Sequence, residues 1–230
     1  MIGIIGAMRI EVDALKAKLA NPVTETISGI DFHKGQLNGV DVVVAVSGIG
    51  KVFAAICAQT MILHFGVDKI INSGVAGTLS DKLHIGDVAI STELVQHDMD
   101  TSCIGDPHGL LSGINIVKLP ADEGLYRSVE SVAKELGMNC LLGTIATGDQ
   151  FIANAERKQW IKETFDGIAV EMESGSIAHV CYVNRIPFTA IRVISDEASG
   201  EACMDYMEFV KLAADRSMAI TEKLLPLIAR

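Results

Sequence analysis

Short apolar runs bounded by glycine or asparagine alternate with longer amphipathic segments along the whole chain of 230 residues. A short apolar run fits a buried strand, and apolar residues recurring every three to four positions fit a helix. The runs predict strands at Ile2–Gly6, Ile27–Leu37, Val40–Val46, Lys69–Asn72, Asp87–Leu94, Leu141–Thr147, Ile168–Val170 and Pro187–Ile194. The amphipathic segments predict helices at Glu11–Leu19, Val52–Phe65, Asp122–Leu136, Ala155–Glu163, Ser174–Asn184 and Asp205–Ala229. This alternation is typical of the α/β class.

The connections between these elements indicate how the chain is organised. Asn38 and Gly39 separate two of the runs, and both residue types accept the positive φ angles of a tight hairpin turn, which predicts a mixed sheet. No repeat, charge block or linker divides the chain, so we expect a single domain over residues 1–230. The stretch Gln96–Pro120 carries glycines and little periodicity, as is typical of a long functional loop. Its apolar residues would be a liability in water, so we also expect this loop to take part in a dimer interface; they are Ile104, Leu110, Leu111, Ile114 and Ile116.

Composition excludes several classes of partner. The chain holds 19 lysines and arginines against 29 aspartates and glutamates, a formal charge of −10 with no basic run, so nucleic acid is not an expected partner. The first residues lack the basic lead of a signal peptide, and no apolar stretch is long enough to cross a membrane. The five cysteines, an odd number without a CxxC pair, are typical of buried thiols in a reducing compartment. We therefore expect a soluble, cytoplasmic protein without a membrane partner.

Three glycine-rich stretches match nucleotide-binding loops only in part. Gly48–Lys51 is followed by valine where a P-loop has serine or threonine, and the spacing of Gly3 and Gly6 does not fit a dinucleotide fold. Ser73–Gly77 follows a predicted strand, so its small residues either let backbone amides approach a ligand or form a plain tight turn. We expect no cofactor.

Metal and acyl-transfer chemistry find little support in the sequence. His97, Asp98 and Asp100 have side chains that bind metals, but no second cluster with metal-ligand spacing accompanies them. A solvated loop is the favoured interpretation, and no metal is expected. No Gly-x-Ser-x-Gly motif supplies an acyl-transfer nucleophile.

Carboxylates follow three of the predicted apolar strands. Glu171 and Glu173 come after one strand, Asp196 ends another, and Glu11 follows the turn after the first. Each acid alone fits a surface charge near a helix N-terminus. Open α/β sheets bind ligands at the carboxyl ends of their strands, so the acids are expected to face one crevice, where paired carboxylates can share general-acid and general-base work.

Six motifs at and around these acids occur in the order found in the bacterial 5′-methylthioadenosine/S-adenosylhomocysteine nucleosidases. The motifs are IIGAMRIEV (4–12), SGIGKV (47–52), NSGVAG (72–77), TGDQFI (147–152), AVEMES (169–174) and RVISDEA (192–198). The chain resembles this family over essentially its whole length. The resemblance implies a single-domain three-layer α/β/α sandwich around a mixed, partly barrel-like sheet, a small-molecule nucleoside substrate, and a homodimer.

The resemblance also implies a role for each acid. Asp196, oriented by Ser195, is expected to protonate N7 of adenine, and Glu11 to position and deprotonate the attacking water, which Arg192 also contacts. Glu173 is expected to bind the ribose hydroxyls. Departing adenine carries negative charge and the ribose left behind becomes oxocarbenium-like, so an acid and nearby carboxylates suit the reaction. Asp196 must then hold a proton near neutral pH, and we expect burial and the neighbouring acids to favour this.

The remaining implied contacts line the substrate. Met8 and Met172 are expected beside the ribose, Phe151 and Ile152 at the base, and Ile49 and Tyr206 at the 5′-substituent. Two features depart from the family pattern. Arg9 and Ile10 stand where many members carry acids, and Val75 stands where many carry a serine that helps to hold the water.

Two other activities remain open on the same fold. A purine nucleoside phosphorylase needs a basic pocket for phosphate, which Glu11 would repel. A catalytically silent nucleoside-binding protein would have lost a catalytic acid, but all three are present. Among nucleosidases, the sequence leaves open whether the 5′-substituent is methylthio, homocysteinyl, plain deoxy or that of aminodeoxyfutalosine.

Overall fold

The computed structural model describes residues 1–196 and 202–229. Its strands are β1 (Ile2–Gly6), β2 (Ala20–Ile27), β3 (Ile30–Leu37), β4 (Val40–Val46), β5 (Lys69–Thr78), β6 (Val88–Gln96), β7 (Leu119–Pro120), β8 (Cys140–Thr147), β9 (Gly167–Glu171) and β10 (Phe188–Asp196). Its helices are α1 (Arg9–Ala17), α2 (Lys51–Leu63), the 3-10 helix η1 (Ser102–Ile104), α3 (Glu123–Glu135), α4 (Ala155–Phe165), α5 (Ser174–Asn184) and α6 (Ala202–Ile228). Glu197 and Ala198 of the RVISDEA motif, and the Cys203 side chain, lie outside the described part.

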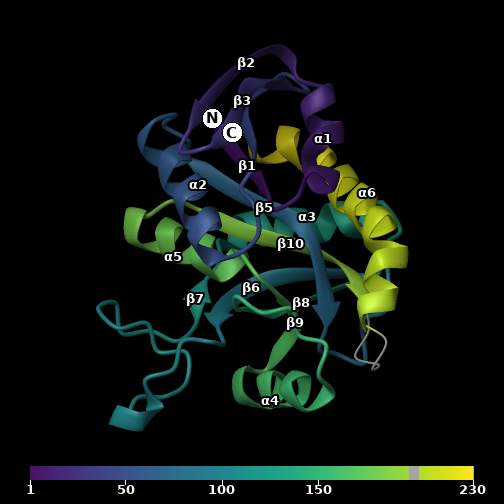
Figure 1. The fold of residues 1–230 in the computed structure, drawn as a ribbon. Helices are drawn as coiled ribbons and strands as arrows, with labels where there is room; N and C mark the ends of the chain where they lie inside the picture. The colour runs from purple at the N-terminus through teal and green to yellow at the C-terminus, as the bar shows by residue number, and fades with distance from the viewer. Residues whose placement is uncertain (197–201, 230) are drawn as a thin grey trace.

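Five strands of the sheet close into a barrel. β10 pairs with both β5 and β6, β8 pairs with β6 and β9, and β9 returns to β5. From β5 the sheet continues through β1, β4, β3 and β2 to the edge at the top of Figure 1. β5 pairs in parallel with β1 and β10 but antiparallel with β9, which confirms the predicted mixed sheet.

Helices cover both faces of this sheet because successive strand residues point to opposite sides. In β1, Ile5 packs in a core with α2 and α5, whereas Ile4 packs in a second core with α1, α3 and α6. A third, smaller core includes Ile161 and Phe165 of α4. These three cores confirm the predicted three-layer arrangement around a partly barrel-like sheet.

The first hairpin region differs from its prediction. Asn38 and Gly39 have φ angles of 52° and 78° and join β3 to β4 in the expected tight turn. The predicted strand Ile27–Leu37, however, is divided by a second such turn at Ser28 and Gly29, with φ angles of 52° and 75°. β2 precedes that turn, and nearly all of its residues are exposed. An exposed strand has no apolar alternation, so the pattern did not reveal it.

The glycine-rich stretch Ser73–Gly77 is a strand and not a turn. β5 does not end at Asn72, as predicted, but runs on to Thr78 and pairs with β10 along this stretch. The tight-turn interpretation is therefore wrong.

The segment Gln96–Pro120 extends away from the body at the lower left of Figure 1. It contains η1, β7 and a bridge between Leu111 and Ile116, so it is more ordered than predicted. Leu111 is buried and Ile114 and Ile116 pack against a core, whereas Ile104 is 77% exposed.

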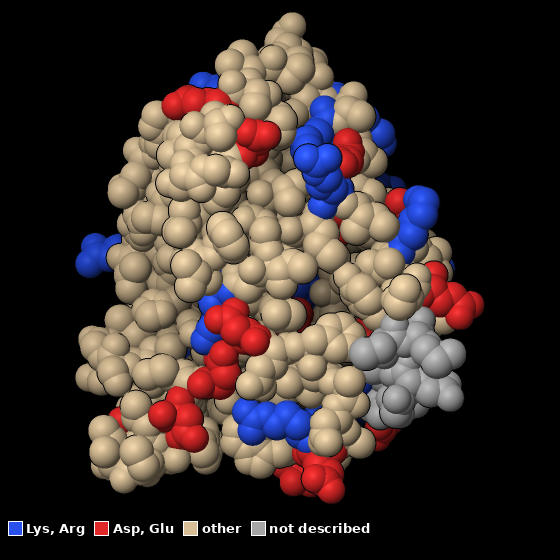
Figure 2. Space-filling view, viewed as in Figure 1, with Lys and Arg blue, Asp and Glu red and all other residues tan. Residues whose placement is uncertain are grey.

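Exposed apolar side chains gather on two neighbouring helices, α2 and α5, and not on the segment Gln96–Pro120. Val52, Phe53 and Leu63 of α2 and Tyr182 and Val183 of α5 are all exposed. These five residues are called the α2–α5 face below. Figure 2 shows that the surface over α2 carries few charged side chains.

Two further expectations concerned the cysteines, expected to be buried thiols, and membrane-spanning segments, of which none was expected. Cys57 and Cys181 are buried free thiols as predicted, but Cys103 is exposed. Within the described residues, no helix is both long and apolar enough to cross a membrane.

Candidate active site

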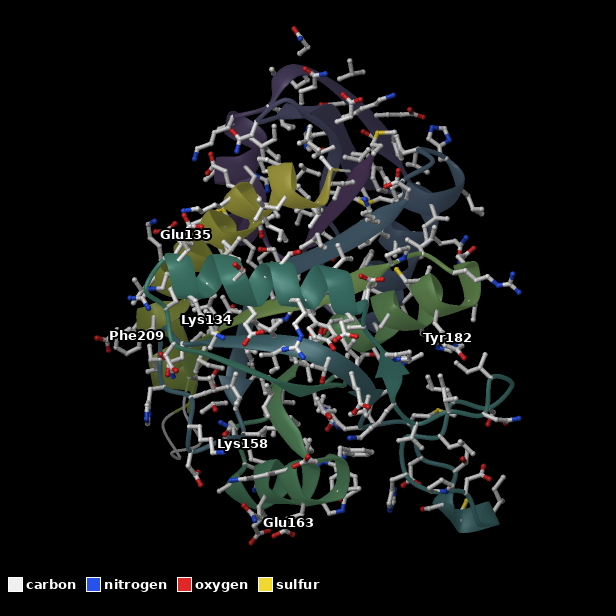
Figure 3. All side chains as sticks on the ribbon, turned by 180° about the vertical axis from the view of Figure 1, so that it is seen from behind. Lys134, Glu135, Lys158, Glu163, Tyr182 and Phe209 are labelled. Atoms are coloured by element: carbon white, nitrogen blue, oxygen red, sulfur yellow. The ribbon has the colours of Figure 1, made fainter. Side chains whose placement is uncertain are left out.

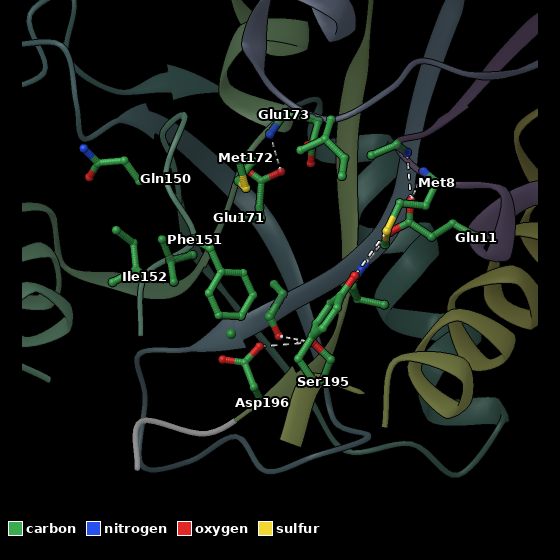
Figure 4. A pocket seen from close by; sticks show the side chains of 17 residues that line it. Met8, Glu11, Gln150, Phe151, Ile152, Glu171, Met172, Glu173, Ser195 and Asp196 are labelled. Carbon is green, nitrogen blue, oxygen red and sulfur yellow. Dashed lines mark hydrogen bonds between the residues drawn. The ribbon is translucent and has the colours of Figure 1, made fainter. Parts of the chain in front are cut away.

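A cavity of about 370 Å³ opens where several strands end. Its walls come from the β1–α1 turn, the β4–α2 loop, β5, the β8–α4 loop, the end of β9, the end of β10 and α6 (Figure 4). The lining residues are Ala7, Met8, Glu11, Ile49, Val75, Ala76, Gly77, Gln150, Phe151, Ile152, Val170, Glu171, Met172, Glu173, Ser195, Asp196 and Tyr206. This position is the one expected for a ligand site in a sheet with parallel strands.

Glu11 lies in the first turn of α1, directly after β1. Its Oε2 accepts hydrogen bonds from the backbone N–H of Ala7 (2.7 Å) and Met8 (2.9 Å), and its Oε1 accepts one from the N–H of Val75 (3.1 Å). Burial raises the pKa of Glu11 above its ordinary value, although the charge of Arg192 and the three amides oppose this. Glu11 is therefore held rigidly and is a stronger base than an exposed glutamate.

Glu171 ends β9 and Glu173 directly precedes α5, and the two acids differ in their surroundings. Glu171 accepts hydrogen bonds from Arg192 Nη2 (2.6 Å), from the Thr147 hydroxyl and from the backbone N–H of Ser174 (2.8 Å). Burial alone would raise the pKa of Glu171, but Arg192 and these hydrogen bonds hold it below its usual range. Burial and the charge of Glu171 raise the pKa of Glu173 to about 8, although it accepts a hydrogen bond from the Gly50 N–H (3.0 Å).

Asp196 is the last residue of β10 and follows a β-bulge in that strand. The register with β5 shifts between Ile194 and Asp196, so that Asp196 pairs with Gly77. The Ser195 hydroxyl donates to Asp196 Oδ1 (3.1 Å), and Lys158 Nζ lies 3.4 Å from Oδ2. Burial and the neighbouring acids favour a protonated Asp196, whereas the ammonium of Lys158 acts in the opposite direction and favours the carboxylate.

Two glycines of β5 make room for these carboxyl groups. A Cβ atom at Gly74 would lie 2.6 Å from Glu11 Oε1, and one at Gly77 would lie 2.6 Å from Asp196 Oδ2. Both distances are far below van der Waals contact. Gly74 and Gly77 are thus required by the acids that pack against them.

The opposite part of the cavity is apolar and aromatic. Phe151 is 47% exposed, and its ring meets that of Tyr206 edge to face with centroids 5.6 Å apart. The Tyr206 hydroxyl lies 3.1 Å from Met8 Sδ. A ring open to the cavity can stack on a planar ligand such as a purine.

The loops that carry Ile49 and Phe151 are joined by a cycle of polar contacts, here called the loop clamp. Asp98 accepts from Lys51 Nζ (2.7 Å) and from the backbone N–H of Asp149 (2.9 Å), and Asp149 accepts from the backbone N–H of Lys51 (2.7 Å). The predicted solvated loop at His97 and Asp98 is therefore wrong: His97 is 1% exposed and Asp98 is partly buried in the clamp. No group of metal-binding side chains occurs among the residues that the structure describes.

Eleven of the twelve residues singled out in the sequence line the cavity, and Arg192 does not. Arg192 is 1% exposed, and its guanidinium binds Glu171 and Asn72 in the interior. Glu171 was among the acids expected at the crevice and lines the cavity, although the resemblance implied no specific role for it, and Lys158 was not predicted at all. The available signal was that Lys158 shares the buried face of α4 with Ile161 and Phe165, at a helical spacing where an apolar residue is expected.

Comparison with known proteins places this fold and cavity in a family. The family model described as the phosphorylase superfamily matches residues 1–226, and the chain belongs to this superfamily of enzymes. Within it, the chain is similar to solved structures of bacterial 5′-methylthioadenosine/S-adenosylhomocysteine nucleosidases, as its motifs indicated. A Helicobacter pylori enzyme with 5′-methylthioadenosine in its active site is 36% identical, with a TM-score of 0.94 and coverage of 99% of this chain and 98% of that one.

Two further structures show how far the similarity extends. The nucleosidase of Neisseria meningitidis in complex with methylthio-immucillin-A is 33% identical, with a TM-score of 0.95 and 99% of each chain covered. A futalosine hydrolase of Helicobacter pylori is 36% identical, with a TM-score of 0.94 and coverage of 99% of this chain and 97% of that one. The chain is thus a nucleosidase-like member of the superfamily, and the structures similar to it include both methylthioadenosine/S-adenosylhomocysteine nucleosidases and a futalosine hydrolase.

Proposed function

We propose that the protein hydrolyses the N-glycosidic bond of 5′-substituted adenosines, such as 5′-methylthioadenosine and S-adenosylhomocysteine, and releases adenine. The observation that carries this proposal is the cavity in which Glu11, Glu173 and Asp196 converge beside an exposed aromatic ring. Three buried acids beside a ring that can stack on adenine match the needs of the reaction.

Each acid has one task in the proposed reaction. Asp196 gives its proton to adenine N7 while the bond between C1′ and N9 breaks and its electron pair leaves with adenine. Water adds to C1′ of the oxocarbenium-like ribose and loses a proton to Glu11, whose raised pKa suits a base. Glu173 binds the ribose hydroxyls, and Arg192 contributes through Glu171, to which its guanidinium is bonded.

The charge of the cavity favours water over phosphate as the attacking group. The described lining residues include no lysine, arginine or histidine. The nearby cations Arg192 and Lys158 are each held against an acid, Glu171 and Asp196. A phosphate dianion needs cationic donors to replace its hydration, so phosphorolysis is disfavoured.

The test is an adenine-release assay in phosphate-free buffer with four nucleosides in parallel: 5′-methylthioadenosine, S-adenosylhomocysteine, 5′-deoxyadenosine and aminodeoxyfutalosine. We expect adenine and a free sugar from at least one of them, at a rate that added phosphate does not increase. Release that depends on phosphate and yields a sugar phosphate would assign the chain to the phosphorylases. Binding without release would make it a silent nucleoside-binding protein.

Aminodeoxyfutalosine is a second candidate for the main substrate. The similarity to a futalosine hydrolase of Helicobacter pylori, equal in identity to that of the nucleosidase, favours including it. Ile49, at the expected 5′ end of the cavity, is 56% exposed, so an extended substituent has space beside it. The relative kcat/KM for the four nucleosides decides between the candidates.

We also propose that the protein acts as a homodimer through the α2–α5 face. Val52 is 69% exposed, Phe53 53% and Leu63 74%, and adjoining exposed apolar side chains on a folded protein mark an interaction surface. The face adjoins Ile49, so a second copy would also cover the 5′ end of the cavity. The loop Gln96–Pro120 was predicted to form the interface. Its Ile104 is exposed and could join such a contact, but its Leu111 is buried within the same subunit and could not.

A further inference from the structure

Lys158 is a buried lysine that does not line the cavity. It lies on the side of α4 that faces the body of the molecule, whereas Glu163 lies on the outer side (Figure 3). Only 3% of Lys158 is exposed, and its Nζ lies 3.4 Å from Oδ2 of Asp196, which is also 3% exposed. Lysines are almost never fully buried unless they are paired, because removing the ammonium from water is costly.

We propose that Lys158 is a positioning residue for the reaction, whose ammonium fixes the Asp196 carboxyl group and stabilises the carboxylate left after Asp196 has protonated the leaving base. This inference rests on the proposed function. In the step concerned, the O–H bond of Asp196 breaks, an N–H bond forms on adenine, and a negative charge appears on the Asp196 oxygens. A fixed cation beside a developing charge lowers the barrier without reorganisation.

The geometry gives the two carboxyl oxygens of Asp196 different partners. The Ser195 hydroxyl binds Oδ1 and the Lys158 ammonium faces Oδ2, so both oxygens are held when the group is ionised. Only an ionised carboxyl group gains from the ammonium, and this gain increases as the proton leaves. Lys158 therefore contributes more to the transition state than to the bound substrate, which is the condition for an effect on kcat.

The same contact has a second, opposite effect. An ammonium near a carboxyl group favours the ionised form, so Lys158 lowers the pH above which Asp196 has lost its proton. Among the residues that the structure describes, the other titratable groups that face this part of the cavity are Tyr206 of α6, Glu11 of α1, Glu171 at the end of β9 and Glu173 directly before α5. All of them remain when Lys158 alone is changed, so a shift in the pH profile reports on Lys158.

A matched control lies one helical turn away. Lys162 of α4 also has its Nζ 3.4 Å from an aspartate, Asp81, but the side chains of this pair are 36% and 96% exposed. Exposed pairs contribute little because water and salt screen them. Lys162→Met therefore removes the same kind of charge from the same helix without affecting the site.

The experiment compares pH profiles of kcat/KM for adenine release by the wild type, Lys158→Met and Lys162→Met. For Lys158→Met we expect the rate at acidic pH to fall about tenfold, and the decline at alkaline pH to begin roughly one pH unit later. Lys158→Gln, which retains a polar end, is the second variant and should show the same shift. Lys162→Met should match the wild type.

A double-mutant cycle tests whether Lys158 acts through Asp196. If it does, adding Lys158→Met to Asp196→Asn costs little further activity, because the charge that Lys158 stabilises no longer forms. An additive loss, or an unchanged alkaline decline in a folded Lys158 variant, overturns the proposal and leaves the nucleosidase function intact. A wild type that releases no adenine overturns the proposed function itself.

Discussion

The acids of the cavity are of one chemical type, and their neighbours set them apart. Arg192 lies against Glu171 and holds its pKa low, whereas Glu173 lies beside that charge and has its pKa raised to about 8. Glu11 meets three backbone amides yet has a raised pKa because it is buried. Such differences allow neighbouring carboxyl groups to act as acid, base and ligand at one pH.

Asp196→Asn tests the general acid. Asparagine retains the shape of the side chain but has no acidic proton, so we expect kcat to fall by about 10² to 10⁴-fold. The measurement is adenine release under saturating nucleoside, with circular dichroism to verify folding. Near-normal turnover in a folded variant would remove Asp196 from this role.

Glu11→Gln tests the base. Because a base acts mainly in the transition state, we expect a large loss in kcat while the dissociation constant of the nucleoside changes little. Stopped-time assays give kcat, and calorimetry with a non-hydrolysable analogue gives the binding constant. An increase in KM at unchanged kcat would instead make Glu11 a binding residue.

Glu173 gives a prediction about stability and pH. Its pKa is about 8 in the folded protein against an ordinary value of 4.5, so the folded state binds the proton more tightly than the unfolded state. The stability from this group is complete below pH 4.5 and is lost as the pH rises toward and through 8. Between pH 5 and pH 9 the wild type should therefore lose about a few kcal/mol more unfolding free energy than Glu173→Gln. Urea unfolding at both pH values measures this difference, and equal losses would contradict it.

At the scale of helices and strands, the loop clamp joins parts of the chain that are distant in sequence. Asp98→Ala removes the acceptor of both Lys51 Nζ and the Asp149 N–H, so the loops bearing Ile49 and Phe151 lose their connection. We expect KM to rise about tenfold with a smaller change in kcat, because the substrate must then order these loops. Asp100→Ala, at an exposed position two residues along, is the control. Equal KM values for the two variants would show that the clamp does not position the loops.

The same scale shows what sequence can predict. The buried strands and the helices were found with errors of a few residues, because burial imposes a period of two or of 3.6 on the apolar residues. β2 was missed because it is exposed. The end of β5 was placed too early because its glycines suggested a turn, whereas they make room for the side chains of Glu11 and Asp196. The acids were found from their places after strands. Lys158 and the loop clamp were not found, because they depend on contacts between segments far apart in the chain.

At the scale of the whole molecule, the α2–α5 face tests the proposed dimer. Val52 lies in the first turn of α2, where a negative charge suits the helix dipole, so Val52→Glu should leave the fold intact while placing two like charges in the interface. We expect a dimer by light scattering for the wild type at micromolar concentration and a monomer for the variant. Because a second copy would cover the cavity beside Ile49, the monomer should also show a raised KM. Val23→Glu, at an equally exposed position on β2, should remain dimeric and active. A wild type that is a fully active monomer would rule out both the dimer and its part in the site.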